Sequence, residues 1–223
     1  MIPLRDDNPT ELVPYVSRAV LVLCVLTFGW QLTLDPRAAA IAIHALGMIP
    51  VVLFGRAELP AEAAWIAPPL TVVTSMFLHG GLWHLAGNML YLWVFANNIE
   101  DHYGHAGFVV FYLVSGVAAA LAQAVPTPDS AVPMIGASGA VSGVLGAYAV
   151  LYPRSRILVL IPLPFLLQLL RVPAAVLLAL WFGMQLLMSV GAPDAGVAFR
   201  AHIGGFIAGV LLAFVWRGRR RRR

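Results

Sequence analysis

The chain has 223 residues, of which 61% are hydrophobic and only 11% are charged, and its formal net charge is +4. This composition leaves too little polar surface to cover a soluble globule of that length, so it indicates a protein of the lipid bilayer. The single cysteine, Cys24, excludes a disulfide within the chain and a metal site built from several thiolates.

The hydrophobic residues are gathered in runs that predict membrane-spanning helices. A helix needs about 17 to 25 apolar residues to cross ~30 Å of hydrocarbon. Six runs meet this requirement: residues 16–34, 82–99, 107–124, 136–152, 173–190 and 199–216. Three shorter stretches, 41–54, 66–79 and 157–170, contain prolines, and we expect them to be interfacial or re-entrant. The first run is expected to be an uncleaved helix rather than a signal peptide, because several spans follow it.

These runs predict an all-α, six-helix polytopic membrane protein with a single membrane domain over residues 16–216. A short N-terminus, 1–15, precedes the domain and a basic tail, 217–223, follows it. The connection between the first two helices, residues 35–81, is unusually long, and long ordered loops tend to be functional.

The arginines predict how the chain is oriented in the membrane. The chain has no lysine, and six of its 14 basic residues lie in the last seven positions. Arg154, Arg156 and Arg171 surround the connection between the fourth and fifth helices, so this connection and both termini are expected in the cytoplasm. The absence of lysine suggests an arginine-rich bacterial genome and hence the bacterial inner membrane. Nucleic-acid binding by the tail is the weaker reading, because no aromatic residues are interleaved with its arginines.

Strongly polar side chains inside spans are costly and usually have a purpose. In the second predicted helix, His84 and Asn88 are four residues apart and project from one face, and His79 precedes them on the loop. Taken alone, this group is more typical of hydrogen bonds that hold helices together.

A serine motif opens the fourth predicted helix. Ser138 lies between Gly136 and Gly139, and Gly139, Gly143 and Gly146 form a smooth stripe that another helix can approach closely. A serine at a helix start can also be a simple cap.

A histidine motif opens the sixth predicted helix. His202 follows Ala201, and Ala201, Gly205, Gly209 and Ala213 repeat every four residues as a second small-residue face. Such a histidine can also be a plain interfacial residue with its ring in water.

The predicted topology brings these motifs to one side of the membrane, because the second, fourth and sixth helices all start there. The two small-residue faces would let Ser138 and His202 come within hydrogen-bond range. A neutral histidine can activate a serine hydroxyl as a nucleophile. Acyl transfer also needs donors for an oxyanion, and the side chains of His84 and Asn88 and the Ser138 backbone N–H are available. Helices four to six contain no Asp or Glu, so a Ser/His pair is expected rather than a triad.

Together, the Gly136 to Gly139 motif, the His84 and Asn88 pair and the His202 motif with Gly205 resemble the rhomboid intramembrane serine proteases, over about residues 70–216. The resemblance implies a six-helix core that cuts single-span membrane proteins near their extracytoplasmic end, without cofactor or metal. It also implies Ser138 as nucleophile, His202 as base, and His84 and Asn88 as oxyanion donors.

The chain departs from some members at Ser142, where they carry a tyrosine that stacks on the histidine. Support for the His202 ring is therefore expected from another aromatic residue, with Phe206 and Trp181 as the candidates.

Three other functions fit parts of the pattern. A catalytically silent rhomboid-like protein would bind membrane helices without chemistry, although it would normally have lost the serine or histidine. A transporter could use His79, His84 and His202 as a proton relay. A membrane metalloprotease could bind zinc through the same histidines, but no His-Glu-x-x-His motif occurs.

The turn between the second and third helices holds four further ionisable residues. His102 and His105 lie there with Glu100 and Asp101, on the cytoplasmic side, and the two histidines are expected to be solvated loop residues.

Overall fold

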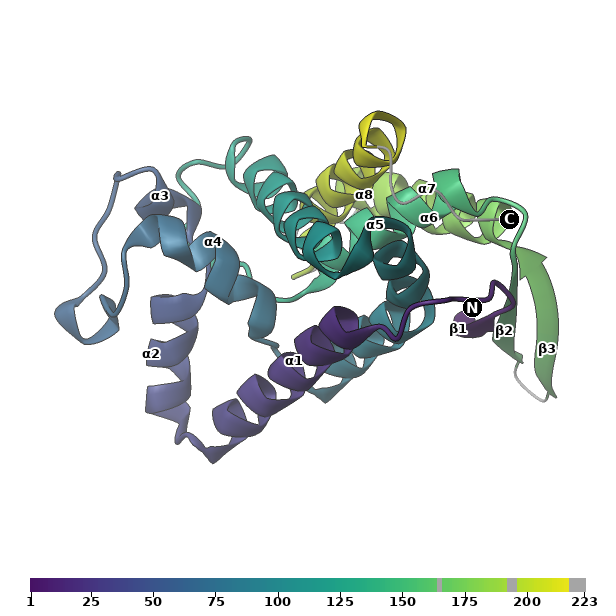
Figure 1. Ribbon diagram of the computed structural model, residues 1–223. Coiled ribbons are helices and arrows are strands. Elements are labelled where there is room, and N and C mark those ends of the chain that lie inside the picture. Colours follow the sequence, from purple (N-terminus) through teal and green to yellow (C-terminus); the bar gives the residue numbers. More distant parts are fainter. Residues whose placement is uncertain (164–165, 192–195, 217–223) are drawn as a thin grey trace.

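The structure is a computed structural model that describes residues 1–163, 166–191 and 196–216, so the predicted tail, 217–223, lies outside the described residues. Figure 1 shows helices for most of the length, with a small sheet at one edge of the helical bundle and α2 to α4 at the opposite edge. In chain order the elements are β1 (Ile2–Asp6), α1 (Tyr15–Thr33), α2 (Pro36–Leu46), α3 (Pro50–Leu53), the short 3₁₀ helices η1 (Ala61–Ala63) and η2 (Pro68–Leu70), α4 (Thr71–Thr74), the 3₁₀ helix η3 (Ser75–Phe77), α5 (Leu82–Ala124), α6 (Ser138–Leu151), β2 (Arg156–Leu163), β3 (Leu166–Pro173), α7 (Ala174–Gly191) and α8 (Phe199–Val215).

The long helices follow the predicted apolar runs. Within the described residues, α1, α5 and α7 are long and apolar enough to cross a membrane, and α6 and α8 are apolar but shorter. The 43-residue α5 is interrupted at Gly104, whose φ of 72° is not helical. The second and third predicted helices therefore correspond to the two limbs of α5 on either side of this glycine.

The all-α prediction is wrong in one region, because residues 157–163 and 166–170 of the apolar stretch 157–170 lie in two β-strands. Strands β2 and β3 pair antiparallel, and β1 joins them in the order β1-β2-β3. Pro162 cannot donate a helical hydrogen bond, whereas the branched residues Ile157 and Val159 alternate along β2 and are buried. The hairpin thus pairs backbone groups that a proline-broken helix would leave unpaired.

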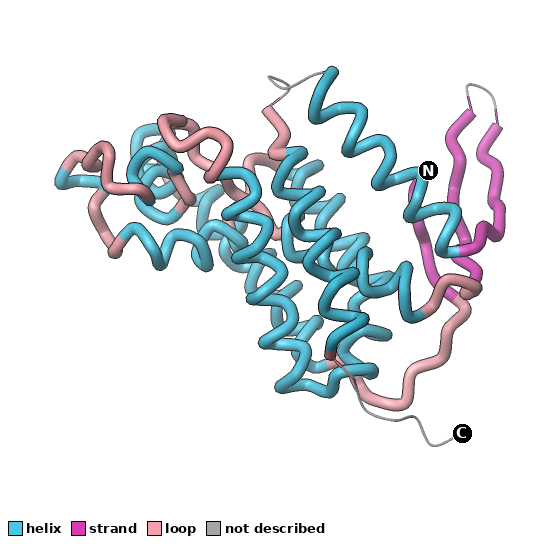
Figure 2. The backbone as a smooth tube through the Cα atoms, turned by 90° about the horizontal axis from the view of Figure 1, so that it is seen from above, coloured by secondary structure: helices cyan, strands magenta, loops and turns pink. Residues whose placement is uncertain are grey.

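Helix α6 is the centre of the bundle, since every residue from Gly139 to Tyr148 is buried. It packs against α5 and α8, within the group of helices that Figure 2 shows from above, with the three strands at one edge. The contact with α8 is made between backbones: a methyl group added at Gly205 would lie 2.0 Å from the Gly139 carbonyl oxygen, and one at Gly209 would lie 1.9 Å from that of Gly143. The predicted meeting of the two small-residue faces is confirmed.

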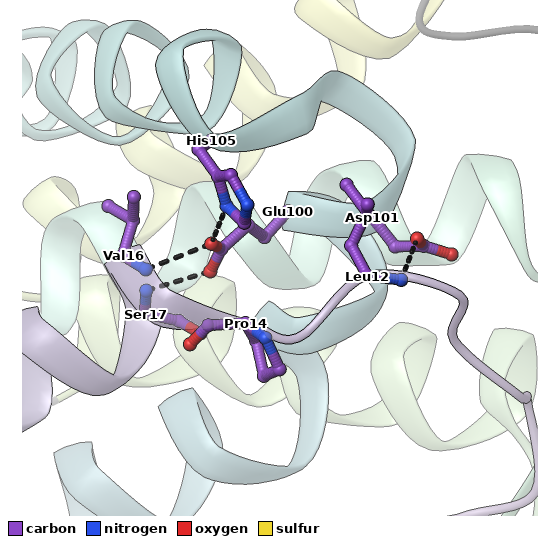
Figure 3. Close-up of polar contacts among 7 residues, drawn as sticks. All are labelled: Leu12, Pro14, Val16, Ser17, Glu100, Asp101 and His105. Atoms are coloured by element: carbon purple, nitrogen blue, oxygen red, sulfur yellow. Dashed lines mark hydrogen bonds and ion pairs between the residues drawn. The ribbon is translucent and has the colours of Figure 1, made fainter.

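The acidic pair at the α5 bend, Glu100 and Asp101, is buried, whereas His102 and His105 beside it are half-buried. Glu100 has no exposed surface, and its carboxylate accepts hydrogen bonds from the backbone N–H groups of Val16 at 2.9 Å and Ser17 at 2.8 Å. Figure 3 shows this carboxylate also facing His105, whose Nδ1 lies 2.6 Å away. Glu100 therefore caps the first turn of α1, where N–H groups lack partners within the helix and negative charge is favoured.

The neighbouring carboxylate extends this attachment to the segment before α1. Asp101 accepts a hydrogen bond from the Leu12 backbone N–H at 2.9 Å, also drawn in Figure 3. Further along the N-terminal segment, Asp6 accepts from the Tyr148 hydroxyl at 2.7 Å and from the Asn98 amide at 2.6 Å. Hydrogen bonds therefore attach the residues before α1 to α5 and α6, although the bonded residues are about ninety positions or more apart in the sequence.

Candidate active site

Ser138 and His202 lie together between α6 and α8. The Ser138 Oγ atom is 2.8 Å from His202 Nε2, which is ordinary hydrogen-bond length. Ser138 is the first residue of α6 and His202 lies in the first turn of α8, and both side chains are half-buried. The backbone contact of Gly205 with α6, one turn after His202, fixes the spacing of the two helices close to the pair.

Helix α6, which begins at Ser138, is too short to cross a bilayer. Its 14 residues make a helix of about 21 Å, which is shorter than the ~30 Å hydrocarbon layer. The chain therefore reaches Ser138 through extended residues, which are held by a bridge between Met134 and Met48 and by a 2.8 Å bond from the Gly136 N–H to the Ser75 carbonyl.

His84 faces the residues that lead into Ser138. Its Nδ1 accepts a hydrogen bond from the Gly80 N–H at 3.3 Å, so in the neutral ring the proton is on Nε2. That nitrogen is directed at Gly136, where an added methyl group would lie only 2.6 Å from it. Gly136 also has a φ of 119°, which side chains with a Cβ rarely adopt. Glycine is therefore required here both by the backbone and by the imidazole.

Asn88 lies one turn further along α5, on the same face as His84. Its Nδ2 donates to the His84 carbonyl at 3.0 Å and lies 3.8 Å from the position that a methyl group on Gly136 would take. An amide nitrogen carries two N–H groups, so one remains to donate elsewhere. The start of α6 adds backbone N–H groups that have no partner within the helix. The geometry thus gathers N–H donors around the approach to Ser138.

A residue that sequence analysis missed contacts the other nitrogen of His202. Gln185 of α7 is buried, and its Oε1 lies 2.8 Å from His202 Nδ1. It is a strongly polar residue in the fifth predicted span, and this signal was available in the sequence. The Trp181 ring, one turn earlier on α7, lies 6.0 Å from the His202 ring at 37°. Of the two aromatic candidates for ring support, Trp181 lies beside the histidine, and Phe206 stacks on Trp181 and Phe182.

His79 lies outside the pair and supports the loop that precedes α5. The side-chain amide of Gln31 holds its backbone twice, accepting from the His79 N–H at 3.0 Å and donating to the His79 carbonyl at 3.1 Å. The imidazole is buried and meets the His84 ring edge-on at 5.2 Å. Burial, and to a smaller extent the neighbouring His84, lowers the pKa of His79 to about 4, so the ring is neutral at physiological pH.

The structure does not assemble the three histidines of the zinc alternative. Across residues 1–163, 166–191 and 196–216, no group of three His, Cys, Asp or Glu side chains is placed to hold a metal ion. Nothing in this part of the chain therefore favours a metal centre over the Ser138 and His202 pair.

Comparison with known proteins places the chain in a family. The model of the Rhomboid domain matches residues 68–219, a range that contains Ser138, His202, His84 and Asn88. The mitochondrial Rhomboid protein 1 of Saccharomyces cerevisiae is 30% identical over 192 residues, which cover 76% of this chain and 51% of that protein. The rhomboid protease GluP of Bacillus subtilis is 32% identical over 167 residues, which cover 73% of this chain and 29% of that protein.

A third relative matches a shorter segment. The mitochondrial presenilin-associated rhomboid-like protein of Mus musculus is 34% identical over 103 residues, which cover 45% of this chain and 26% of that protein. The chain thus spans about half the length of the yeast relative and less than a third of the other two. With a domain match over most of its length and apolar helices long enough to span a bilayer, the chain is an integral membrane protein that belongs to the rhomboid family.

Proposed function

We propose that the chain is an intramembrane serine endopeptidase, with Ser138 as the nucleophile and His202 as the general base. The observation that supports this most directly is the 2.8 Å contact between Ser138 Oγ and His202 Nε2 in a half-buried position between two apolar helices. A serine hydroxyl bonded to an unprotonated imidazole nitrogen is the arrangement from which acyl transfer starts.

The reaction follows from these two groups. Ser138 Oγ attacks the carbonyl carbon of the scissile peptide bond while His202 Nε2 takes the hydroxyl proton. The imidazolium then gives that proton to the leaving amine, and the C–N bond breaks to leave an acyl ester on Ser138. A water molecule, deprotonated by His202, hydrolyses the ester, and Ser138 regains its proton. No cofactor or metal takes part in these steps.

The N–H donors near Ser138 stabilise the negative charge that develops on the carbonyl oxygen. The Nε2–H of His84, the free N–H of Asn88 and the Ser138 backbone N–H are the proposed oxyanion donors. Fixed donors of this kind typically contribute about 100-fold to 1,000-fold in rate each. Gly136 leaves room for the His84 ring and Gly139 for the Ala119 side chain, so both groups pack closely at the start of α6.

The substrates that fit such a site are membrane proteins with a single span, cut in or near that span. We propose six spans within residues 16–216, with the N-terminal residues 1–15 and the tail 217–223 in the cytoplasm. The site then opens toward the extracytoplasmic side of a bacterial inner membrane. This orientation rests on the arginines that flank the predicted spans.

Two measurements on purified protein in liposomes test the proposal. We expect a serine-directed fluorophosphonate to label the wild type but neither Ser138→Ala nor His202→Ala. We also expect the wild type to cut a single-span reporter protein and Ser138→Ala to leave it intact. Reporter binding without cleavage or labelling would instead identify a catalytically silent membrane-helix-binding protein. Ion flux that survives loss of Ser138 would identify a transporter, and cleavage abolished by a chelator but indifferent to the fluorophosphonate would identify a metalloprotease.

A further inference from the structure

The partner of His202 Nδ1 is the one buried polar side chain of α7. Four residues of this helix are buried, namely Ala174, Leu177, Leu178 and Gln185, and α7 is described over its whole length. The residues on either side of Gln185 are apolar and lie on the exposed face of α7, with Met184 54% and Leu186 45% exposed. A buried amide on such a helix is costly unless it is hydrogen-bonded, and here it is bonded to the histidine.

The surroundings of Gln185 decide which way its amide points. Its Nε2 faces the Trp181 carbonyl oxygen on the preceding turn, at 3.5 Å, and that oxygen can only accept. If the amide oxygen and nitrogen of Gln185 were exchanged, its oxygen would face the Trp181 carbonyl oxygen, and neither could donate a hydrogen bond. The oxygen Oε1 therefore faces His202 Nδ1, at 2.8 Å.

This orientation fixes the tautomer of the histidine. An amide oxygen is an acceptor only, so His202 Nδ1 must carry the proton. Nε2 is then unprotonated in the neutral ring, and its lone pair is the atom that meets Ser138 Oγ. The rotation of the ring is fixed as well, because the two contacts, both 2.8 Å, hold its opposite nitrogens.

We propose that Gln185 is the positioning residue of the site and takes the place that a carboxylate holds in a Ser-His-Asp triad. This role rests on the proposed function. Gln185 holds His202 in the tautomer that can accept the serine proton, and its amide dipole then faces the imidazolium that forms. An amide does this without placing a full negative charge inside the membrane, where charge is costly. It also accounts for the absence of any Asp or Glu in α6, α7 and α8.

Two substitutions separate this role from simple packing. Gln185→Met keeps a long flexible side chain but removes the acceptor, and Gln185→Glu keeps the acceptor and adds a charge. Met184→Leu is the matched control, because it changes the adjacent, exposed residue of α7. Cleavage of the reporter in liposomes gives kcat, KM and the pH profile for each variant, and thermal unfolding reports whether each one is folded.

We expect Gln185→Met to lower kcat by about threefold to tenfold with little change in KM, which is the effect of losing one net hydrogen bond in the transition state. Gln185→Glu should retain activity at alkaline pH. The acidic side of its pH–activity profile (the acid limb) should move to higher pH by about one unit or more, because a carboxylate beside the ring stabilises the imidazolium. Met184→Leu should match the wild type in every measurement.

The role is overturned if a cleaving wild type and Gln185→Met share the same kcat and pH profile. It is equally overturned if Gln185→Glu folds and its acid limb stays where the wild type has it, since packing alone would leave that limb unmoved. A wild type that neither cleaves the reporter nor reacts with the fluorophosphonate refutes the proposed function itself and removes the role with it. The two failures are therefore distinguishable.

Discussion

A single methyl group at Gly205 should separate the two proposed catalytic residues without touching either of them. In Gly205→Ala the new carbon would lie 2.0 Å from the Gly139 carbonyl oxygen, whereas ordinary contact begins at 3.4 Å, so α8 must move away by about 1.4 Å. The obstacle is backbone, which cannot rotate aside as a side chain can. The Ser138 to His202 distance of 2.8 Å would lengthen toward about 4 Å, beyond hydrogen-bond range.

The expected loss of activity is large and the expected loss of stability is modest. A misplacement of about 1 Å in a catalytic site can cost on the order of 100-fold in rate. Overpacking typically costs about 1 to 3 kcal/mol in the free energy of unfolding, which most proteins survive. We therefore expect Gly205→Ala to lower kcat for reporter cleavage, and the rate of fluorophosphonate labelling, by about 100-fold while remaining folded.

The assay compares equal amounts of folded protein in liposomes, with thermal unfolding as the check. Gly29→Ala in α1 is the matched control, since its new methyl group meets nothing within 4 Å and should leave activity unchanged. A folded Gly205→Ala variant with kcat within about twofold of the wild type would show that the backbone contact does not set the catalytic distance.

Three further predictions follow from contacts outside the pair. Gly136→Ala should abolish cleavage while labelling of correctly folded protein also falls, because the methyl group would lie 2.6 Å from His84 Nε2 at a φ of 119°; full activity would contradict the assigned approach to Ser138. Glu100→Gln should lower the free energy of unfolding by about 1 to 3 kcal/mol, because the buried carboxylate accepts two backbone hydrogen bonds. The same change at the exposed Glu58 should have no effect, and equal stability of the two variants would argue that Glu100 does not cap α1. The stability of the wild type should fall as pH drops from about 6.5 to about 4, because the folded chain holds the pKa of His79 at about 4 while the unfolded chain binds a proton near 6.5. Thermal unfolding of His79→Asn should show a smaller loss of stability over this pH range, and a loss equal to that of the wild type would exclude His79 as its cause.

Apolar runs predicted the long helices well because a span must satisfy its own backbone, and the chain has few other ways to do so. The predicted limits of the first and sixth spans, 16–34 and 199–216, differ from α1 and α8 by one residue at most at each end. The hairpin of β2 and β3 was missed because its residues are as apolar as those of a helix. What distinguishes it is its pairing with β1, and that contact joins residues more than 150 positions apart.

The polar residues were harder to place, because the sequence shows on which helix they lie but not which groups they contact. Glu100 lies in the turn between two predicted spans, yet it meets the start of α1, a contact that depends on how two helices cross. The meeting of Ser138 and His202 could be predicted because each lies beside a stripe of small residues. Gln185 carries no such stripe, so its contact with His202 became visible only once the rotation of α7 was known.

The central position of α6 has a consequence for how the membrane acts on this protein. Changes in bilayer thickness or lipid composition act on a helix through the residues that touch lipid. From Gly139 to Tyr148 α6 is buried throughout, whereas α7 exposes large apolar residues such as Leu187 at 69% and Val190 at 84%. Hydrophobic mismatch is therefore expected to tilt α7 before it disturbs α6, and through the proposed role of Gln185 such a tilt would change the orientation of His202.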